Sequence, residues 1–231
     1  MGQNASELSD VLPAAVPYRP GRQIRAGLGA RSAADAIGPL SPGCSIFALG
    51  AGGFTVADVL AYLLDEIGPA SLTIATWTAG RADIWRTSQL LTDGRVRSLR
   101  LLTDKSLPHR NPAYFAALLE RYGPASVCLS NVHCKFAVLR NAAWSLVLRT
   151  SSNLDAVCRL ESFDLDDDAE LARYLETVVD AIFAEQAAGR SFDQFVAAHL
   201  PPARTYFGDG VLDADLRRAG WTHAATGRGL A

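Results

Sequence analysis

Short apolar segments recur along the middle of the chain, and they predict a set of β-strands. Each segment is four to seven residues long and is rich in Val, Ile, Leu and Ala, and such short apolar runs are typical of buried strands. The segments are residues 45–49, 72–77, 96–102, 126–129, 135–139 and 144–149, the last two joined by a short turn at Arg140 and Asn141.

Apolar residues at three- and four-residue intervals predict helices between these strands. Residues 59–67 show this spacing most clearly. Thr55 and Asp58 have the spacing of a capping box before this helix, and Gly68 followed by proline ends it. The other predicted helices are residues 30–37, 81–91, 112–122, 166–188 and 192–200. Strands that alternate with helices predict an α/β domain with a mixed sheet.

Composition divides the chain into three parts. Residues 1–43 contain five prolines and many Gly, Ser and Ala residues, which predicts an N-terminal arm with little regular structure. Residues 44–190 hold the strands and main helices and form the predicted α/β domain. Residues 191–231 predict a short C-terminal helix and a polar tail. No internal repeat is visible in the sequence.

The overall charge is close to neutral. The 22 basic and 24 acidic residues argue against a surface covered in positive charge, although a local basic groove remains compatible with them. The densest basic stretch, residues 81–100, either lines a nucleic-acid groove or forms solvated helix and strand faces. Trp77, Trp85 and Trp144 are either base-stacking residues or part of the core and its rim.

Cysteine spacing and hydropathy exclude several classes of protein. The four cysteines show no C-x-x-C spacing, so we expect no metal, no cofactor and no redox pair. No run of 18 apolar residues and no signal-peptide pattern is present. We therefore expect a cytoplasmic protein without stable membrane association.

Unusual polar residues gather between residues 131 and 161. His133 and Lys135 lie two residues apart at a predicted strand start, so we expect both side chains on one face of the sheet. Lys135 is one of only two lysines in the chain. The next strand ends in residues 150–153, which are Thr-Ser-Ser-Asn. A histidine, an ammonium group and several neutral donors together suit a phosphate.

The order of these residues resembles the phospholipase D-like superfamily. The matching features are His133-x-Lys135, a hairpin, Ser151-x-Asn153 and then Arg159-x-Glu161. The superfamily signature is H-x-K-x4-D followed by G-S-x-N. This chain departs from it, because Arg140 replaces the Asp, Thr150 replaces the Gly, and the hairpin is longer.

The resemblance implies a phospholipase D-like mixed sheet flanked by helices and a metal-free cleavage of phosphodiesters. His133 would attack phosphorus and form a phosphohistidine. Lys135, Asn153 and Ser151 would hold the phosphate oxygens, with Ser152 and Arg159 as further substrate contacts. Glu161 is a candidate to orient a histidine by accepting its ring proton. Members with one motif per chain generally act as homodimers, so the resemblance also implies a two-fold dimer.

The sequence does not determine the substrate. A small chain with one motif looks most like the nuclease branch, which bacteria and phages often encode. Alternatives are a catalytically degenerate module that binds phosphate groups or nucleic acid, and a phospholipid hydrolase. The absence of a basic amphipathic helix argues against the lipid enzyme.

Overall fold

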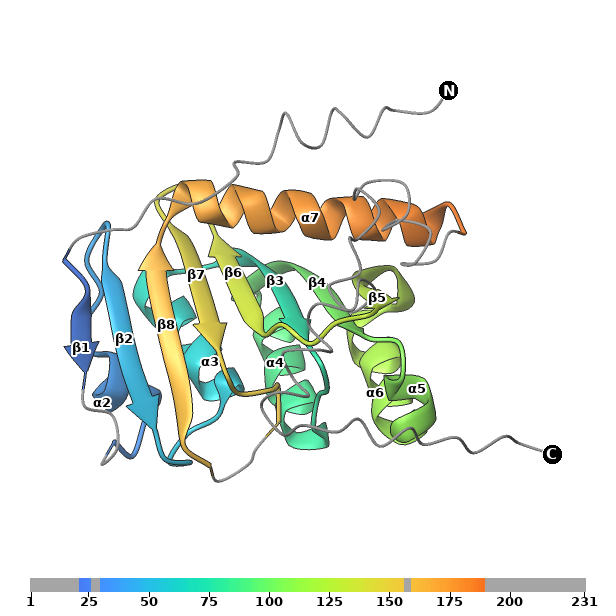
Figure 1. The fold of residues 1–231 in the computed structure, drawn as a ribbon, viewed down its shortest axis with the longest axis horizontal. Helices are drawn as coiled ribbons and strands as arrows, with labels where there is room; N and C mark the ends of the chain where they lie inside the picture. The colour runs from blue at the N-terminus through green and yellow to red at the C-terminus, as the bar shows by residue number, and fades with distance from the viewer. Residues whose placement is uncertain (1–20, 26–29, 156–158, 190–231) are drawn as a thin grey trace, which may run out of the picture.

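The computed structural model describes residues 21–25, 30–155 and 159–189 (Figure 1). The predicted helix at 192–200, the rest of the predicted tail and residues 1–20 of the predicted arm lie outside the described residues.

An eight-stranded mixed sheet forms the centre of the molecule. Its strands are β1 (Gln23–Arg25), β2 (Ser45–Gly50), β3 (Ala70–Thr76), β4 (Val96–Asp104), β5 (Val127–Ser130), β6 (Phe136–Arg140), β7 (Ser145–Thr150) and β8 (Glu161–Asp167). Their order across the sheet is β1-β2-β8-β7-β6-β3-β4-β5. Strands β3, β4 and β5 are parallel, whereas β6 and β8 run antiparallel to their neighbours.

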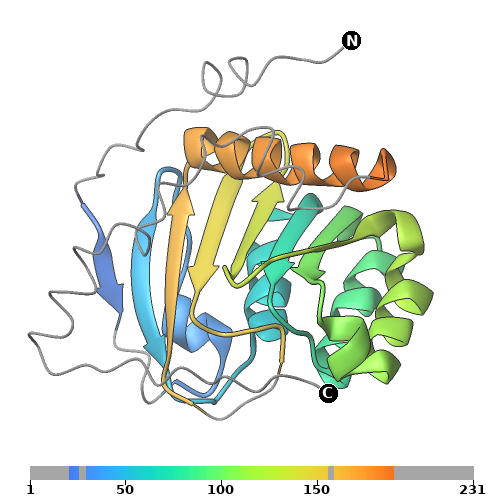
Figure 2. The same cartoon turned by 45° about the vertical axis from the view of Figure 1, so that its right-hand side comes forward.

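Helices cover both faces of the sheet. The helices are α2 (Ala33–Ile37), α3 (Val56–Ile67), α4 (Arg81–Thr92), α5 (Leu107–Arg110), α6 (Pro112–Tyr122) and α7 (Ala169–Ala187), with a 3-10 turn at Pro124–Ser126. Helix α7 crosses β7, β6 and β5 on one face, and α3, α4 and α6 lie behind the other (Figures 1 and 2). The larger core cluster fills the space between the sheet and α3, α4 and α6, where Leu60, Ile74, Ile84 and Leu139 are almost fully buried.

Helix α3 confirms the capping box that the sequence predicts. The hydroxyl of Thr55 accepts a hydrogen bond from the backbone of Asp58 at 3.3 Å, and the Asp58 carboxylate accepts one from the backbone of Thr55 at 2.8 Å. The helix ends at Gly68, whose φ of 76° is a conformation that glycine adopts without strain.

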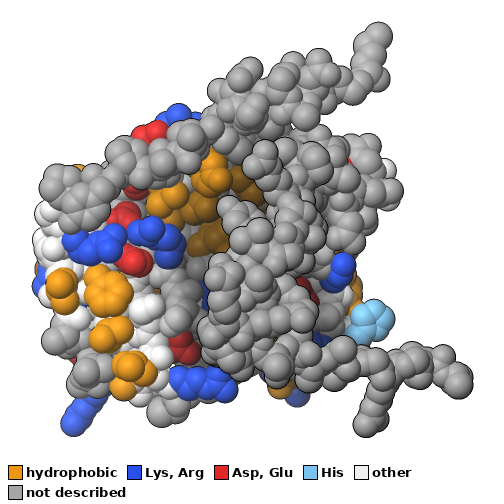
Figure 3. Space-filling model, in the orientation of Figure 1, with side chains coloured by type: hydrophobic (Ala, Val, Ile, Leu, Met, Phe, Trp, Pro, Cys, Tyr) orange, Lys and Arg blue, Asp and Glu red, His pale blue; other side chains and the backbone are white. Residues whose placement is uncertain are grey.

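The predicted helix at residues 166–188 begins too early, because residues 161–167 form strand β8. Phe163 and Leu165 face the core at every second position, while Asp164 and Asp166 face the other side and pair with Arg149. Asp164 also pairs with Arg22 at 3.2 Å. Basic and acidic side chains gather on this face of the molecule (Figure 3). The acids that suggest a helix start are therefore strand residues, and α7 begins only after its cap, Asp168.

Part of the predicted N-terminal arm packs onto the domain. Strand β1 pairs in parallel with β2, and Ala36 and Ile37 of α2 are buried, so the folded unit begins before residue 44. Strand β1 has only three residues, and Ile24 in it is 80% exposed, so no apolar pattern marks it in the sequence. Among the described residues, no helix is long and apolar enough to cross a membrane.

The strand directions bring several loops to one edge of the sheet. Strands β2, β3, β4, β5 and β7 end at this edge, and β6 and β8 begin there. Because β5 is an edge strand and β6 pairs with β3, residues 131–135 must cross the ends of β4 and β3. In open α/β sheets, ligands usually bind at the carboxyl ends of the strands.

Candidate active site

The loop of residues 131–135 is anchored at the end of β4. The backbone of Val132 donates a hydrogen bond to the Asp104 carboxylate at 3.3 Å, and the backbone of Lys105 donates to the carbonyl of Ser130 at 2.8 Å. Asp104 also accepts hydrogen bonds from the backbone and the hydroxyl of Ser106. Burial alone would raise the pKa of Asp104, but the hydrogen bonds from Ser106 and Val132 outweigh it and lower that pKa. Asp104 is thus a charged anchor for the loop that bears His133.

His133 is exposed and lies beside an aromatic residue. Its ring centroid is 6.1 Å from that of Trp77, and the two rings are tilted by 56°. The guanidinium of Arg110 lies 3.8 Å above the Trp77 ring and donates to the Trp77 carbonyl at 3.1 Å. Arg110 also donates to the Ser106 hydroxyl at 2.8 Å. These contacts place α5 beside the site, and α5 also contains His109, which is exposed and to which we assign no role.

Lys135 directs its ammonium group toward the loop. Its Nζ donates a 2.9 Å hydrogen bond to the carbonyl oxygen of His133. The side chain shares a small cavity of about 10 Å³ with Thr150 and Ser152, a volume that holds about one water. The predicted strand at 135–139 in fact starts at Phe136, so His133 lies in a loop and strand alternation does not set its direction.

The segment after β7 is tied to the end of β3 and the start of α4. The backbone of Leu154 donates to the Thr76 hydroxyl at 3.2 Å, and its carbonyl accepts from the backbone of Gly80 at 2.7 Å. The backbone of Ser152 donates to the Thr150 hydroxyl at 3.0 Å. These bonds hold the predicted Ser-x-Asn residues at the edge where residues 131–135 cross.

The side chains of Ser151 and Asn153 differ in their hydrogen bonds. The Ser151 hydroxyl accepts from the backbone of Ser162 at 2.9 Å and donates to the Glu161 carboxylate. The Oδ1 atom of Asn153 is buried and accepts no hydrogen bond from the described residues. An unsatisfied buried acceptor costs about 1–3 kcal/mol, a cost that a bound water or ligand removes.

Four charged groups interact around the Ser-x-Asn segment. Burial raises the pKa of Asp155; the charge of Arg159 lowers this pKa, that of Glu161 raises it, and that of Lys135 lowers it. The charges of Lys135, Arg159 and Glu161 therefore all act on Asp155. Asp155 is a further candidate in this segment, and its only signal in the sequence is an acid two positions after Asn153.

Glu161 and Arg140 have partners away from His133. Glu161 accepts a hydrogen bond from Ser151, and among the described residues none joins it to His133. Arg140 is the last residue of β6 and pairs with Glu176 of α7 at 2.7 Å. Arg140 lies at the opposite end of β6 from Lys135, so the residue that replaces the signature Asp joins the sheet to α7.

The described residues contain no cluster of three or more His, Cys, Asp or Glu side chains that could hold a metal ion. The carboxyl edge of the sheet holds the imidazole of His133, the ammonium group of Lys135, the serine and threonine hydroxyls and the amide of Asn153. This set of donors suits the oxygens of a phosphate.

Comparison with known proteins finds similarity only in structure. No family model and no curated protein sequence matches the chain. NucT from Helicobacter pylori has 19% identity and a TM-score of 0.45, over 61% of this chain and 96% of that chain. Nuc from Salmonella typhimurium, a phospholipase D family member, has 14% identity and a TM-score of 0.41, over 61% and 95% of the two chains. Polyphosphate kinase from Porphyromonas gingivalis has 11% identity and a TM-score of 0.45, over 69% and 27%. These similarities concern the fold alone.

Proposed function

We propose that the protein is a metal-independent phosphodiesterase that cleaves nucleic acid through a phosphohistidine at His133. One observation supports this most directly: the loop with His133, the Lys135 ammonium group and the Ser-x-Asn segment meet at the carboxyl edge of the sheet. His133 is exposed there and can reach a substrate.

The proposed reaction has two steps, and both need a second histidine. The imidazole of His133 attacks phosphorus, a P–N bond forms, and the bond to the leaving oxygen breaks. The His133 of a second copy gives its proton to that oxygen. A water then attacks phosphorus and loses its proton to the same second histidine, and the P–N bond breaks.

Neutral donors and one cation would stabilise the charge that develops on the phosphate oxygens. Lys135, Asn153 and Ser151 are proposed for this role, with Ser152 and Arg159 as further substrate contacts. The Ser151 hydroxyl donates its one hydrogen to Glu161, so it must turn from Glu161 to donate to a phosphate oxygen, and Glu161 is proposed to orient a histidine.

Hydrolysis of bis(p-nitrophenyl) phosphate in the presence of EDTA tests the proposed activity. We expect turnover with EDTA, and we expect His133→Asn to abolish both turnover and covalent phosphate labelling of acid-quenched enzyme. His109→Asn, a change at an exposed histidine of α5, is the matched control and should retain both. Labelling and turnover that survive His133→Asn would contradict the assignment.

The shared site makes a separate prediction about mixtures. When excess His133→Asn protein exchanges subunits with wild type, mixed dimers hold only one competent histidine, so wild-type activity should fall. Activity that stays constant in the mixture, together with a monomer in sedimentation, would contradict a dimeric site.

The second candidate function is a degenerate module that binds phosphate groups or nucleic acid without turnover. Two observations favour it: Glu161 is bonded to Ser151, and Arg140 occupies the position of the signature Asp. Folded protein that binds an oligonucleotide but hydrolyses no diester, with or without EDTA, would support this module. Turnover confined to phospholipid vesicles would instead indicate a lipid hydrolase.

A further inference from the structure

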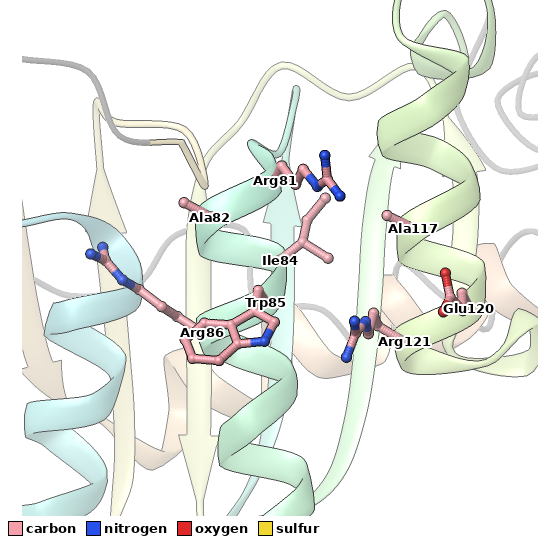
Figure 4. Close-up of a pocket in the computed structure, with 8 residues that line it drawn as sticks. All are labelled: Arg81, Ala82, Ile84, Trp85, Arg86, Ala117, Glu120 and Arg121. Carbon is pink, nitrogen blue, oxygen red and sulfur yellow. The ribbon is translucent and has the colours of Figure 1, made fainter.

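A groove lies between α4 and α6, on the face of the sheet opposite α7 (Figure 4). Its volume is about 590 Å³, which is enough for a nucleobase with its sugar. Ile84 lies toward its floor, and Ala117 of α6 contributes only a methyl group, which leaves the groove open. We call this feature the α4/α6 groove.

The walls of the α4/α6 groove are held at a fixed separation. The Tyr122 hydroxyl of α6 donates a 3.2 Å hydrogen bond to the carbonyl oxygen of Ile84 in α4, and both residues are buried. Leu118 of α6 is fully buried in the same core cluster as Ile84. The groove is therefore preorganised, so binding there need not order its backbone first.

An exposed indole stands in the α4/α6 groove. Trp85 is 53% exposed, one of three large hydrophobic side chains that are exposed among the described residues. Its neighbours along α4, Ile84 and Thr87, are buried, so the position of Trp85 on the outer face of the helix leaves its ring accessible to a ligand. An accessible aromatic ring is the side chain on which unpaired bases stack.

Two arginines line the groove together with the indole. Arg81, at the start of α4, and Arg121, near the end of α6, extend into the gap between the helices (Figure 4). Neither forms an ion pair with any described residue. Glu120, the acid of the groove, lies farther from α4 than Arg121 does (Figure 4). An exposed ring and two guanidinium groups that form no ion pair with described residues line the same groove, which matches a base with its two flanking phosphates.

Arg86 behaves differently from these two arginines. It points toward α3 and pairs with Asp83 at 3.4 Å and Asp58 at 3.6 Å (Figure 4). Its charge is therefore compensated within the protein, so we do not assign it a phosphate.

The α4/α6 groove opens beside the candidate active site. Gly80, the cap of α4, donates its backbone N–H to Leu154 of the Ser-x-Asn segment, and Arg110, which ends α5 just before α6, binds the Trp77 carbonyl. Both helices thus start at the edge that holds His133. Trp85 lies four residues into α4, about 6 Å along the helix axis from Arg81.

We propose that the α4/α6 groove binds a single-stranded segment of nucleic acid that extends from the diester cleaved at His133. One base stacks on Trp85, and its flanking phosphates pair with Arg81 and Arg121. This inference rests on the proposed function and names its substrate class, a strand of several nucleotides with unpaired bases. Duplex DNA does not fit this description, because its bases are stacked on one another.

Oligonucleotide binding tests the proposal without turnover. Fluorescein-labelled single strands of eight nucleotides and the matching duplex are titrated into His133→Asn protein, and anisotropy is read over a range of salt. Adding Trp85→Ala should weaken single-strand binding about tenfold, or about 1.4 kcal/mol, because one base loses its stacking partner. Arg81→Ala and Arg121→Ala should each reduce the salt slope by about 0.7, the value for one phosphate of a single strand, whereas Trp85→Ala should leave the slope unchanged.

Arg97→Ala is the matched control, since Arg97 is exposed, lies near the start of β4 away from the site, and forms no ion pair with described residues. It should leave both the affinity and the slope unchanged. Three outcomes would overturn the proposal: Trp85→Ala weakens single-strand binding no more than Arg97→Ala does, it weakens duplex binding equally, or the protein binds no oligonucleotide at all. Hydrolysis of bis(p-nitrophenyl) phosphate by the wild type decides the proposed function separately, since that small diester has no strand to place in the groove.

Discussion

The ammonium group of Lys135 donates a 2.9 Å hydrogen bond to the backbone carbonyl of His133, so the two residues of the motif are joined directly. The positive charge is thereby held next to the residue proposed as nucleophile. A phosphate at His133 would compete with that carbonyl for the same compact cation.

Lys135→Arg should separate an enzyme from an anion-binding module. A planar guanidinium cannot replace a compact ammonium group at a single phosphate oxygen and in the small space beside Thr150. We expect kcat for bis(p-nitrophenyl) phosphate to fall by at least about 100-fold, as for loss of one transition-state donor. Phosphate binding, measured by calorimetry, should fall much less.

The chain has one other lysine, which gives a matched control for this change. Lys105→Arg, at an exposed position after β4, should leave kcat unaltered. Full activity of Lys135→Arg would be evidence against a specific role for the ammonium group.

Asp104→Asn should loosen the loop that bears His133. The Asp104 carboxylate accepts hydrogen bonds from Val132 and Ser106. Loss of the negative charge of this carboxylate should lower the free energy of unfolding by about 1–3 kcal/mol at pH 7. The pKa of Asp104 is lowered in the folded state, so its stabilisation is complete above the unfolded pKa of about 3.9 and is lost as pH falls through the lower folded value. Urea unfolding across this range should show the gap between wild type and variant closing at low pH.

Asp93→Asn is the comparison for Asp104, because Asp93 is an exposed aspartate at the end of α4. Its effect on stability should stay within about 0.5 kcal/mol. A gap for Asp104→Asn that is the same at every pH would refute the charged anchor.

Asp83→Asn should change stability with the opposite pH dependence. Asp83 is fully buried in α4; burial raises its pKa, and the hydrogen bond from Thr55 and the charge of Arg86 lower it only in part. A raised pKa means that the protonated carboxyl favours the folded state below the unfolded pKa of about 3.9, and that this contribution is lost as pH rises through the folded value. Asn needs no proton and keeps an acceptor for Thr55. In urea unfolding, wild type should therefore lose stability relative to the variant as pH rises above about 4. A difference that grows in favour of wild type would contradict a raised pKa of Asp83.

Arg140→Ala should cost stability without touching the chemistry. Arg140 pairs with Glu176, which is only 14% exposed and belongs to α7, so the pair joins the sheet to the helix. We expect a loss of about 0.5–1 kcal/mol in the free energy of unfolding. A double-mutant cycle with Glu176→Ala should give a coupling of similar size.

Arg140→Asp addresses the departure from the superfamily signature. It places a carboxylate against Glu176, so stability should fall further than in Arg140→Ala, and turnover should not rise. An increase in kcat would mean that the position takes part in the reaction after all.

Local sequence signals predicted the elements whose determinants are neighbours in the chain. The capping box of Thr55 and Asp58, the stop at Gly68 and the apolar spacing of α3 all lie within fourteen residues. Strand β8 was missed because the acids at its outward positions also suit a helix start, and only its pairing with β2 and β7 decides between the two. The same holds for β1, whose three residues are a strand only because β2 lies beside them.

The sequence by itself determined which residues form the candidate site, because His133 and Lys135 are two residues apart, and Ser151 and Asn153 follow one hairpin later. Only the tertiary structure decided what surrounds them. Trp77 lies 56 positions before His133, yet their rings meet, because residues 131–135 must cross from the edge strand β5 to β6 over the end of β3. Asp104 anchors residues 131–135 for the same reason. Trp85 faces a groove because α4 and α6 start at the carboxyl edge of the sheet and pack side by side. Such contacts depend on strand order, which no local spacing encodes.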